Sequence, residues 1–137
     1  MGEARLPRVL DVGQCDFDHG NIARVLSERF GAEVDRCHTA EDALCAVSAE
    51  GFDLVLVNRI FDRDGSEGLK LIERLRAART EALPEPANGP AVMLVSNYAD
   101  AQDASVRAGG VRGFGKATLE SPETMTMLRT YLGRQGA

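Results

Sequence analysis

The sequence has 137 residues, enough for one domain whose apolar core needs neither disulfides nor bound metal. Hydrophobic residues make up 44% of it and charged residues 27%, as in ordinary soluble globular proteins. The net charge of −5 argues against direct binding to nucleic acid or to an anionic membrane, because those surfaces need clustered lysine and arginine. No apolar run approaches the ~20 residues that span a bilayer, and residues 1–7 lack a signal-peptide stretch, so we expect a cytoplasmic protein.

The three cysteines, Cys15, Cys37 and Cys45, form no CxxC pair. A zinc site would need help from His19 and His38, whose spacing from the cysteines matches no usual zinc pattern. We therefore expect small buried or half-buried thiols and no metal.

The first half of the chain alternates predicted strands and helices. Residues 8–12 form a short apolar strand, and residues 20–30 carry apolar side chains at helical spacing. Residues 32–38 indicate a weaker strand, and Thr39 begins a helix in a variant of the capping box. Residues 52–58 are the clearest strand, because their centre is apolar without alternation, as in a strand covered on both faces.

The alternation continues to the end of the chain. The segments are a loop at 59–65, a helix at 66–75, a proline-rich loop at 81–90, a strand at 91–96, a helix at 100–108, a strand at 113–115 and a helix at 121–132. Alternating strands and helices predict an α/β fold with a doubly wound, five-stranded parallel sheet and helices on both faces. We expect one domain over residues 1–137, with its core at about 8–132.

Ligand sites in such folds lie at the carboxyl ends of the strands. The segments to inspect are residues 13–18, 58–65, 96–97 and 115–118.

Several strand-end motifs resemble those of response-regulator receiver domains. Residues 52–57 are similar to the third strand of that family, and residues 90–96, which end in serine, are similar to the fourth. Residues 108–109 and 113–116 resemble the approach to the family's lysine. The resemblance covers residues 8–132 and implies a flavodoxin-like sheet with strand order 2-1-3-4-5.

The resemblance also implies a phosphoryl-transfer site, all three of whose acidic groups this sequence lacks. In receivers a carboxylate after the third strand accepts phosphate, two acidic residues help hold magnesium, and a hydroxyl and a lysine contact the phosphoryl oxygens. Here Asn58 occupies the phosphoacceptor position and Gly13 and Gln14 the acidic pair, whereas Ser96 and Lys116 keep the hydroxyl and the lysine. An amide cannot form the mixed anhydride. We therefore expect no catalytic residue, no magnesium or other cofactor, and no enzymatic activity.

Two further departures concern the loop and the switch position. The loop after Asn58 is about two residues longer than the family's, and it carries Asp62 and Asp64. Counting back from Lys116 puts Gly113 at the family's aromatic switch position, and a shift of one residue puts Phe114 there.

Several site residues allow more than one interpretation. Asn58 can cap the strand end by bonding to loop backbone. Lys116 can bond to Asn58, to a loop carbonyl or to Asp11. Asp11 is either buried, and then paired or protonated, or it reaches water near a strand end. Four acidic residues form either a relocated metal site or a solvated rim: Asp16, Asp18, Asp62 and Asp64.

The leading functional hypothesis is an atypical receiver domain in two-component-type signalling, which binds a protein without being phosphorylated. Its partner would be a signalling kinase, an output protein or a second copy, and the face at residues 99–132 would bind it. One alternative is phosphorylation of a displaced aspartate at residues 59–65. Another is a flavodoxin-like domain that binds a small molecule or nucleotide, although the charges of Asp16 and Asp18 would repel phosphate.

Overall fold

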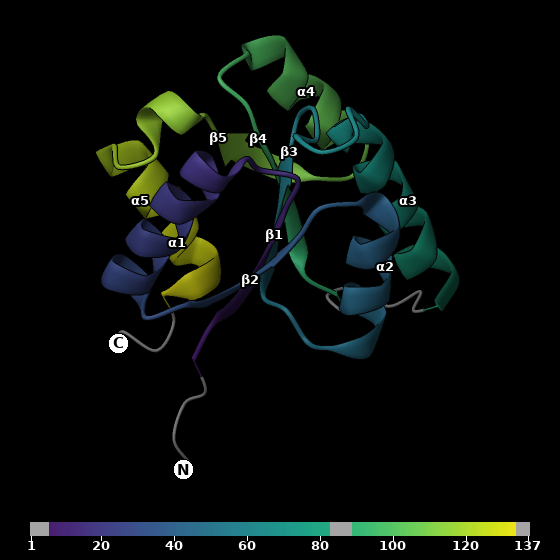
Figure 1. The fold of residues 1–137 in the computed structure, drawn as a ribbon, viewed down its shortest axis with the longest axis horizontal. Coiled ribbons are helices and arrows are strands. Elements are labelled where there is room, and N and C mark those ends of the chain that lie inside the picture. The colour runs from purple at the N-terminus through teal and green to yellow at the C-terminus, as the bar shows by residue number, and fades with distance from the viewer. Residues whose placement is uncertain (1–5, 83–88, 134–137) are drawn as a thin grey trace.

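The computed structural model describes residues 6–82 and 89–133, in which strands and helices alternate along the chain (Figure 1). The elements are β1 (Arg8–Val12), α1 (Asp16–Phe30), β2 (Glu33–Cys37), α2 (Ala40–Ala49), β3 (Leu54–Asn58), α3 (Gly68–Ala82), β4 (Ala91–Val95), α4 (Ala99–Arg107), β5 (Val111–Phe114), a 3-10 turn (Lys116–Thr118) and α5 (Pro122–Leu132). Most of the loop predicted at residues 81–90 lies outside the described residues. No helix in the described part of the chain combines the length and apolarity needed to cross a membrane.

The strands form one parallel sheet in the order β2-β1-β3-β4-β5, which confirms the predicted fold. Helices α1 and α5 cover one face of the sheet, and α2, α3 and α4 cover the other (Figure 1). All strands point the same way, so their carboxyl ends meet along one edge of the sheet. The loops that follow β1, β3, β4 and β5 therefore share that edge.

The core consists of two apolar clusters, one on each face of the sheet. Alternation along β1 sends Val9 toward α1 and α5, and Leu10 and Val12 toward α2 and α3. All five residues of β3 are buried, as predicted for a strand covered on both faces. Most core side chains are Val, Leu, Ile and Met, whose burial is the main favourable contribution to folding.

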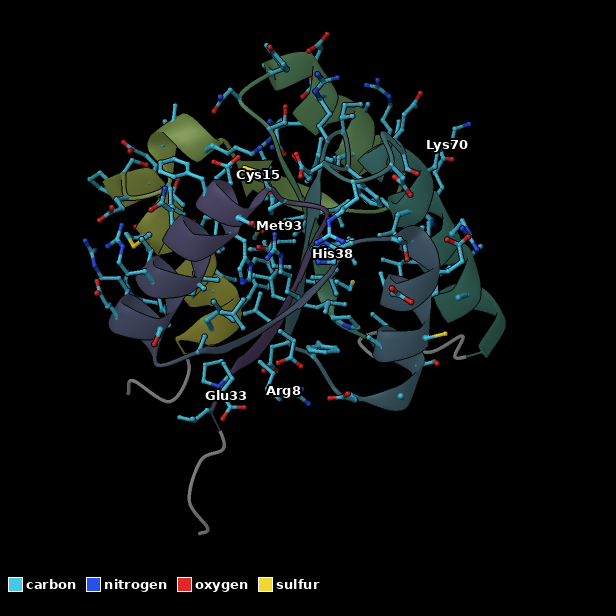
Figure 2. The ribbon with its side chains drawn as sticks, viewed as in Figure 1. Arg8, Cys15, Glu33, His38, Lys70 and Met93 are labelled. Atoms are coloured by element: carbon cyan, nitrogen blue, oxygen red, sulfur yellow. The ribbon has the colours of Figure 1, made fainter. Side chains whose placement is uncertain are left out.

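Most helix ends follow the sequence signals, but α1 begins earlier than predicted and α3 spans Gly68–Ala82 instead of the predicted residues 66–75. Thr39 and Ser121 cap α2 and α5 as predicted, and Gly31 ends α1 in the left-handed conformation that favours glycine. Helix α1 begins at Asp16, four residues before the predicted start at residue 20, because the Cys15 sulfur accepts from the Asp18 N–H. Cysteine is not among the usual capping residues, so the sequence pattern missed this turn. Figure 2 shows Cys15 above the centre of the molecule and Arg8 toward the lower end of the sheet.

One charged side chain lies inside the sheet layer. Asp11 of β1 is fully buried, and its carboxylate contacts the His19 ring of α1 at 2.7 Å. The alternative in which Asp11 reaches water is therefore wrong, and the paired one is confirmed. Burial raises the pKa of the Asp11 carboxyl above its usual value, although the hydrogen bond and charge of His19 act in the opposite direction.

This direction of shift predicts how stability depends on pH. Because the folded state disfavours ionised Asp11, the protein loses stability as the pH rises from about 4 through the folded-state pKa. Asp11→Asn removes the charge and keeps an acceptor for His19. We expect this variant to be more stable than wild type at about pH 7, because burial no longer opposes a charge at residue 11, and the difference to vanish near pH 4.

Urea unfolding at a series of pH values measures the difference. Asp100→Asn, at an exposed position in the first turn of α4, serves as control and should show no gain. A variant Asp11→Asn that is less stable than wild type at neutral pH would show that the ionised pair stabilises the fold.

Candidate functional site

A hollow of about 330 Å³ opens at the carboxyl ends of the strands. It brings together three predicted site residues, Asn58, Ser96 and Lys116. Its other lining residues come from the end of β4, from the first turn of α1 and from the loops after β1, β3 and β4: Cys15, Asp18, Arg59, Ile60, Asp62, Val95, Asn97 and Tyr98. Gly13 and Gln14 are buried and do not line it. The acidic-pair positions are thus separated from the retained hydroxyl and lysine.

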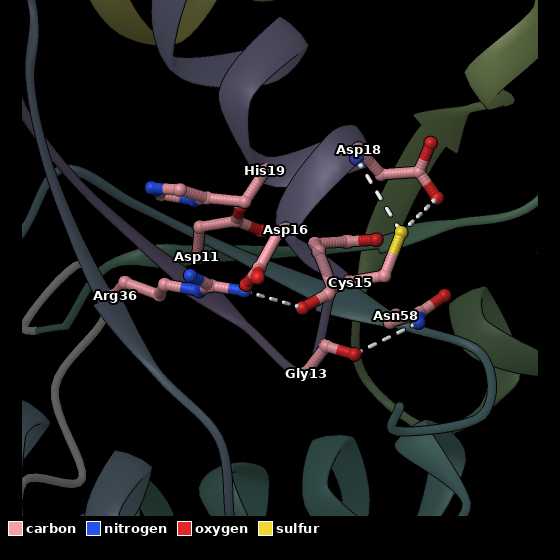
Figure 3. A network of polar contacts seen from close by, with 9 residues as sticks. Asp11, Gly13, Cys15, Asp16, Asp18, His19, Arg36 and Asn58 are labelled. Atoms are coloured by element: carbon pink, nitrogen blue, oxygen red, sulfur yellow. Dashed lines mark hydrogen bonds and ion pairs between the residues drawn. The ribbon is translucent and has the colours of Figure 1, made fainter. Parts of the chain in front are cut away.

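Asn58 uses its side chain to hold backbone. Its Nδ2 donates to the carbonyl oxygens of Gly13, at 2.9 Å, and Ile60, at 2.7 Å (Figure 3). Both partners are acceptors, so the NH2 end of the amide must face them. The interpretation of Asn58 as a cap that binds loop backbone is therefore confirmed.

The loop between β3 and α3 folds over the end of β1. The Asp62 N–H donates to the Gly13 carbonyl oxygen at 2.9 Å, so this oxygen accepts two hydrogen bonds. The ring of Phe61 is 1% exposed and lies directly against Gly13. A Cβ atom at residue 13 would come within 2.4 Å of that ring. A carboxylate at residue 13 therefore has no room unless Phe61 moves.

Gln14 lies in a polar cluster at the start of α1. Its side chain is 1% exposed, and its interaction with Asp11 lowers the pKa of that carboxyl, against the larger effect of burial. Arg36 of β2 donates to the Gln14 carbonyl oxygen at 3.0 Å and to Asp16 at 2.7 Å. Figure 3 shows Arg36 and Asp16 together on this side of Gly13. Gln14 therefore belongs to the packing between β1 and β2.

Ser96 and Lys116 face the hollow with different partners. The Ser96 hydroxyl oxygen accepts from the Tyr98 N–H at 3.1 Å, which starts the turn into α4. The Lys116 ammonium forms an ion pair with Asp18 at 2.8 Å. The three partners suggested for Lys116 by the sequence, namely Asn58, a loop carbonyl and Asp11, are therefore wrong. The sequence predicts a later start for the helix that carries Asp18, so it gives no signal for this ion pair.

The acidic residues near the hollow do not form one cluster. Asp16 pairs with Arg36, Asp18 pairs with Lys116, and Asp64 accepts from the Ser66 N–H at 2.8 Å. Among residues 6–82 and 89–133, no group of three or more His, Cys, Asp or Glu side chains is placed to hold a metal ion. The receiver positions themselves supply two amides and a glycine, a donor set that does not fit magnesium.

The position of the switch aromatic depends on a bulge in β5. Met93 pairs with Val111 and Val95 with Phe114, so β5 has one more residue than β4 between these pairs. Phe114 packs in the core, 4% exposed. A Cβ atom at Gly113 would lie 2.3 Å from the Leu94 carbonyl oxygen. Residue 113 therefore cannot carry a switch side chain without backbone movement, and a switching role for Phe114 stays a prediction.

Gln102 is a structural residue that the sequence analysis missed. This buried side chain of α4 donates to the carbonyl oxygens of Leu94 and Ser96, at 2.9 and 3.2 Å. Its Oε1 accepts from the Gly113 N–H at 2.8 Å. One glutamine thus joins α4 to the ends of β4 and β5. The only sequence signal is a polar residue on the side of the helix that faces the sheet.

A substitution at Gly13 tests how closely the loop between β3 and α3 packs against the end of β1. Gly13 has a φ of +82°, and its missing Cβ makes room for Phe61. We expect Gly13→Ala to lower the free energy of unfolding by about 2 kcal/mol, from backbone strain and overpacking together. Chemical denaturation measures this change.

Gly20→Ala is the matched control. Gly20 lies inside α1, and a Cβ atom there would meet nothing within 4 Å. Alanine in a helix should stabilise the protein by about 0.5–1 kcal/mol. If both variants gave the same change, the contact between Phe61 and Gly13 would not constrain the site.

Comparison with known proteins finds similarity at the level of the fold. No protein-family model matches the chain, and no curated protein sequence matches it significantly. Among solved structures, a response regulator from Chloroflexus aurantiacus J-10-fl has a TM-score of 0.74 at 22% identity; the match covers 95% of this chain and 100% of that one. A CheY-like receiver domain from Methylobacillus flagellatus has a TM-score of 0.64 at 24% identity, over 95% and 98% of the two chains.

A third neighbour is a longer protein. A response regulator from Burkholderia pseudomallei, whose structure holds a phosphorylated aspartic acid, a calcium ion and citrate, has a TM-score of 0.64 at 21% identity. The match covers 92% of this chain but only 66% of that one, just under two thirds of its length. The chain therefore has the flavodoxin-like fold of response-regulator receiver domains, with sheet order 2-1-3-4-5.

Proposed function

We propose that this domain is a receiver-like signalling module that binds a protein partner without being phosphorylated. The receiver fold suggests two-component signalling, and the geometry of the strand-end site supports the loss of phosphorylation. A signalling kinase, an output protein or a second copy of the chain would recognise the surface formed by α4, β5 and α5. On this proposal the domain needs no cofactor and catalyses no reaction.

The observation that carries the proposal is the double hydrogen bond of Asn58. Its amide nitrogen, which faces the Gly13 and Ile60 carbonyl oxygens, replaces an ionised oxygen. An amide is a poor nucleophile and cannot form an acyl phosphate. Phe61 occupies the space over Gly13, where a receiver would place one of its magnesium-binding acids. Nucleophile and metal site are thus missing together.

A second observation supports a fixed interaction surface. Gln102 holds α4 to β4 and β5 through four hydrogen bonds, which are made within the chain itself. Beside it lies a groove of about 670 Å³ that exposes more apolar than polar surface. The groove is lined from α4, β5, the 3-10 turn and α5 by residues that include Ala99, Gly113, Thr118 and Met127. A surface of this kind can bind a partner in a single state of the domain.

The displaced-aspartate alternative concerns Asp62, which lines the hollow, and Asp64, which caps the loop through Ser66. Asp62 follows Asn58 by four residues, and in-line transfer depends on close positioning of the nucleophile. The small-molecule alternative would place a phosphate beside Asp16 and Asp18, whose charges oppose it. The measurement below also separates the displaced-aspartate alternative from the leading one.

Intact mass after incubation with acetyl phosphate and magnesium tests the proposal. We expect no stoichiometric adduct of about 80 Da on the wild type, because residue 58 offers no carboxylate. We also expect none on Asn58→Asp, because residues 13 and 14 still provide no acidic ligands for magnesium. The Burkholderia pseudomallei response regulator, which contains a phosphorylated aspartic acid, is the positive control.

The location of any adduct decides between the hypotheses. A stoichiometric adduct on wild type would contradict the proposal. Peptide mapping to Asp62 or Asp64 would then support the displaced-aspartate alternative. An adduct on Asn58→Asp alone would show that the nucleophile is the only missing part of the site.

The interaction surface is tested by a substitution in the groove. Ala99→Arg places a long charged side chain at an exposed position of the groove at the start of α4, so it should abolish partner capture or self-association. Ser27→Arg, at an exposed position of α1 on the opposite face of the sheet, is the control and should change neither. Affinity capture and light scattering over a concentration series give the readouts. Equal behaviour of both variants would place any partner away from this surface.

A further inference from the structure

The hollow keeps the donors of an oxyanion site. Lys116 contributes an ammonium group, and Ser96 contributes a hydroxyl whose oxygen already accepts from the Tyr98 N–H, which leaves its hydrogen available to a second partner. Arg59 also lines the hollow, and its guanidinium stacks 5.1 Å from the centre of the Tyr98 ring. Donors of this kind around one hollow suit a small tetrahedral oxyanion such as phosphate or sulfate.

The structure places a carboxylate of the chain itself at these donors. Asp18 Oδ2 lies 2.8 Å from Lys116 Nζ and 3.3 Å from the Cys15 thiol, which donates to it. The Asp18 side chain is 22% exposed and the Lys116 side chain 35% exposed, so water only partly screens the pair. Asp18 also lies in the first turn of α1, where the helix dipole favours a negative charge. Figure 3 shows Asp18 and Cys15 on the same side of Asn58.

We propose that Asp18 is a built-in ligand for Lys116, which fills an oxyanion subsite and prevents free phosphate or sulfate from binding there. The carboxylate replaces the anion that the donors would otherwise bind, and it also repels a second anion from the hollow. Lys116 is then retained because it holds the start of α1 to the turn after β5. This inference extends the proposed function, since it explains how a site that takes no phosphoryl group stays occupied.

The charge balance of the pair agrees with this assignment. Partial burial opposes ionisation of Asp18, but the hydrogen bonds from Lys116 and Cys15 and the charge of Lys116 outweigh it and lower the pKa of the carboxyl. Asp18 therefore stays ionised at neutral pH. Asp16, two residues earlier, is also held ionised, but by Arg36 on the far side of the turn. This difference makes Asp16 a matched control.

The test is a phosphate titration followed by amide NMR shifts, with chloride at equal ionic strength as the reference and sulfate as a second probe. Asp18→Asn removes the competing charge without changing the shape of the side chain. We expect saturable shifts at the amides of Ser96, Asn97 and Lys116 in this variant, with an affinity at least tenfold higher than that of wild type. Asp16→Asn should behave as wild type does. The double variant Asp18→Asn/Lys116→Gln should lose the response.

Three results would overturn the proposal. These are equal phosphate affinity in wild type and Asp18→Asn, no response in Asp18→Asn, and a response that survives Lys116→Gln. The readout is reversible binding, so it is independent of any covalent adduct on residue 58. A covalent phosphoryl adduct on the wild type would refute the proposed function. It would not affect the phosphate titration, which tests the role of Asp18 separately.

A second measurement does not depend on the folding of Asp18→Asn. Titration of the carboxyl carbons by NMR in wild type and in Lys116→Gln reports directly on the pairing. The pKa of Asp18 should rise when Lys116 is removed, and the pKa of Asp16 should stay unchanged. An Asp18 pKa that does not respond would show that this carboxylate is not the ligand of Lys116.

Discussion

The structure at the carboxyl ends of the strands depends on the hydrogen bonds to the carbonyl oxygen of Gly13. It accepts from the Asn58 side chain and from the Asp62 N–H, and so ties the ends of β1 and β3 to the loop between them. A buried amide that meets two carbonyl oxygens satisfies groups that would otherwise lose hydrogen bonds with water. An acidic residue at position 58 could not make these contacts, because an ionised carboxylate has no hydrogen to donate. The amide nitrogen that makes these hydrogen bonds stands where a carboxylate oxygen would be needed to accept a phosphoryl group.

Two other side chains at this edge of the sheet, Lys116 and Gln102, also have their partners within the chain. Lys116 has Asp18 as its partner, and Gln102 joins α4 to the ends of β4 and β5. In a switchable domain, a ligand must bind one conformation better than another. Here Asp18 and Gln102 make such contacts from within the chain. Under the proposed function, the domain would therefore keep one conformation.

The strands, the helices and the sheet order follow from the sequence because their signals are local and repeated. Residues 52–58 are recognisable as a buried strand by composition alone, and Thr39 and Ser121 by their capping chemistry. The contacts of the site are not local. The pairing of Lys116 with Asp18 requires the start of α1, which Cys15 caps in an unusual way, and the pairing of Asp11 with His19 requires the tertiary packing of α1 on β1. The bulge in β5 likewise depends on the register against β4, so counting residues back from Lys116 could not locate it.

The contact between Gly13 and the ring of Phe61 has a consequence for how this sequence could have changed over time. The ring fits as it lies only where residue 13 has no side chain, and a carboxylate at residue 13 fits only where the ring has moved. A side chain added at residue 13 would meet the ring, whereas a smaller side chain at residue 61 would leave a cavity over Gly13, so either single change should lower the stability of the fold. The two positions are therefore energetically coupled, and changes at them should be better tolerated together than one at a time.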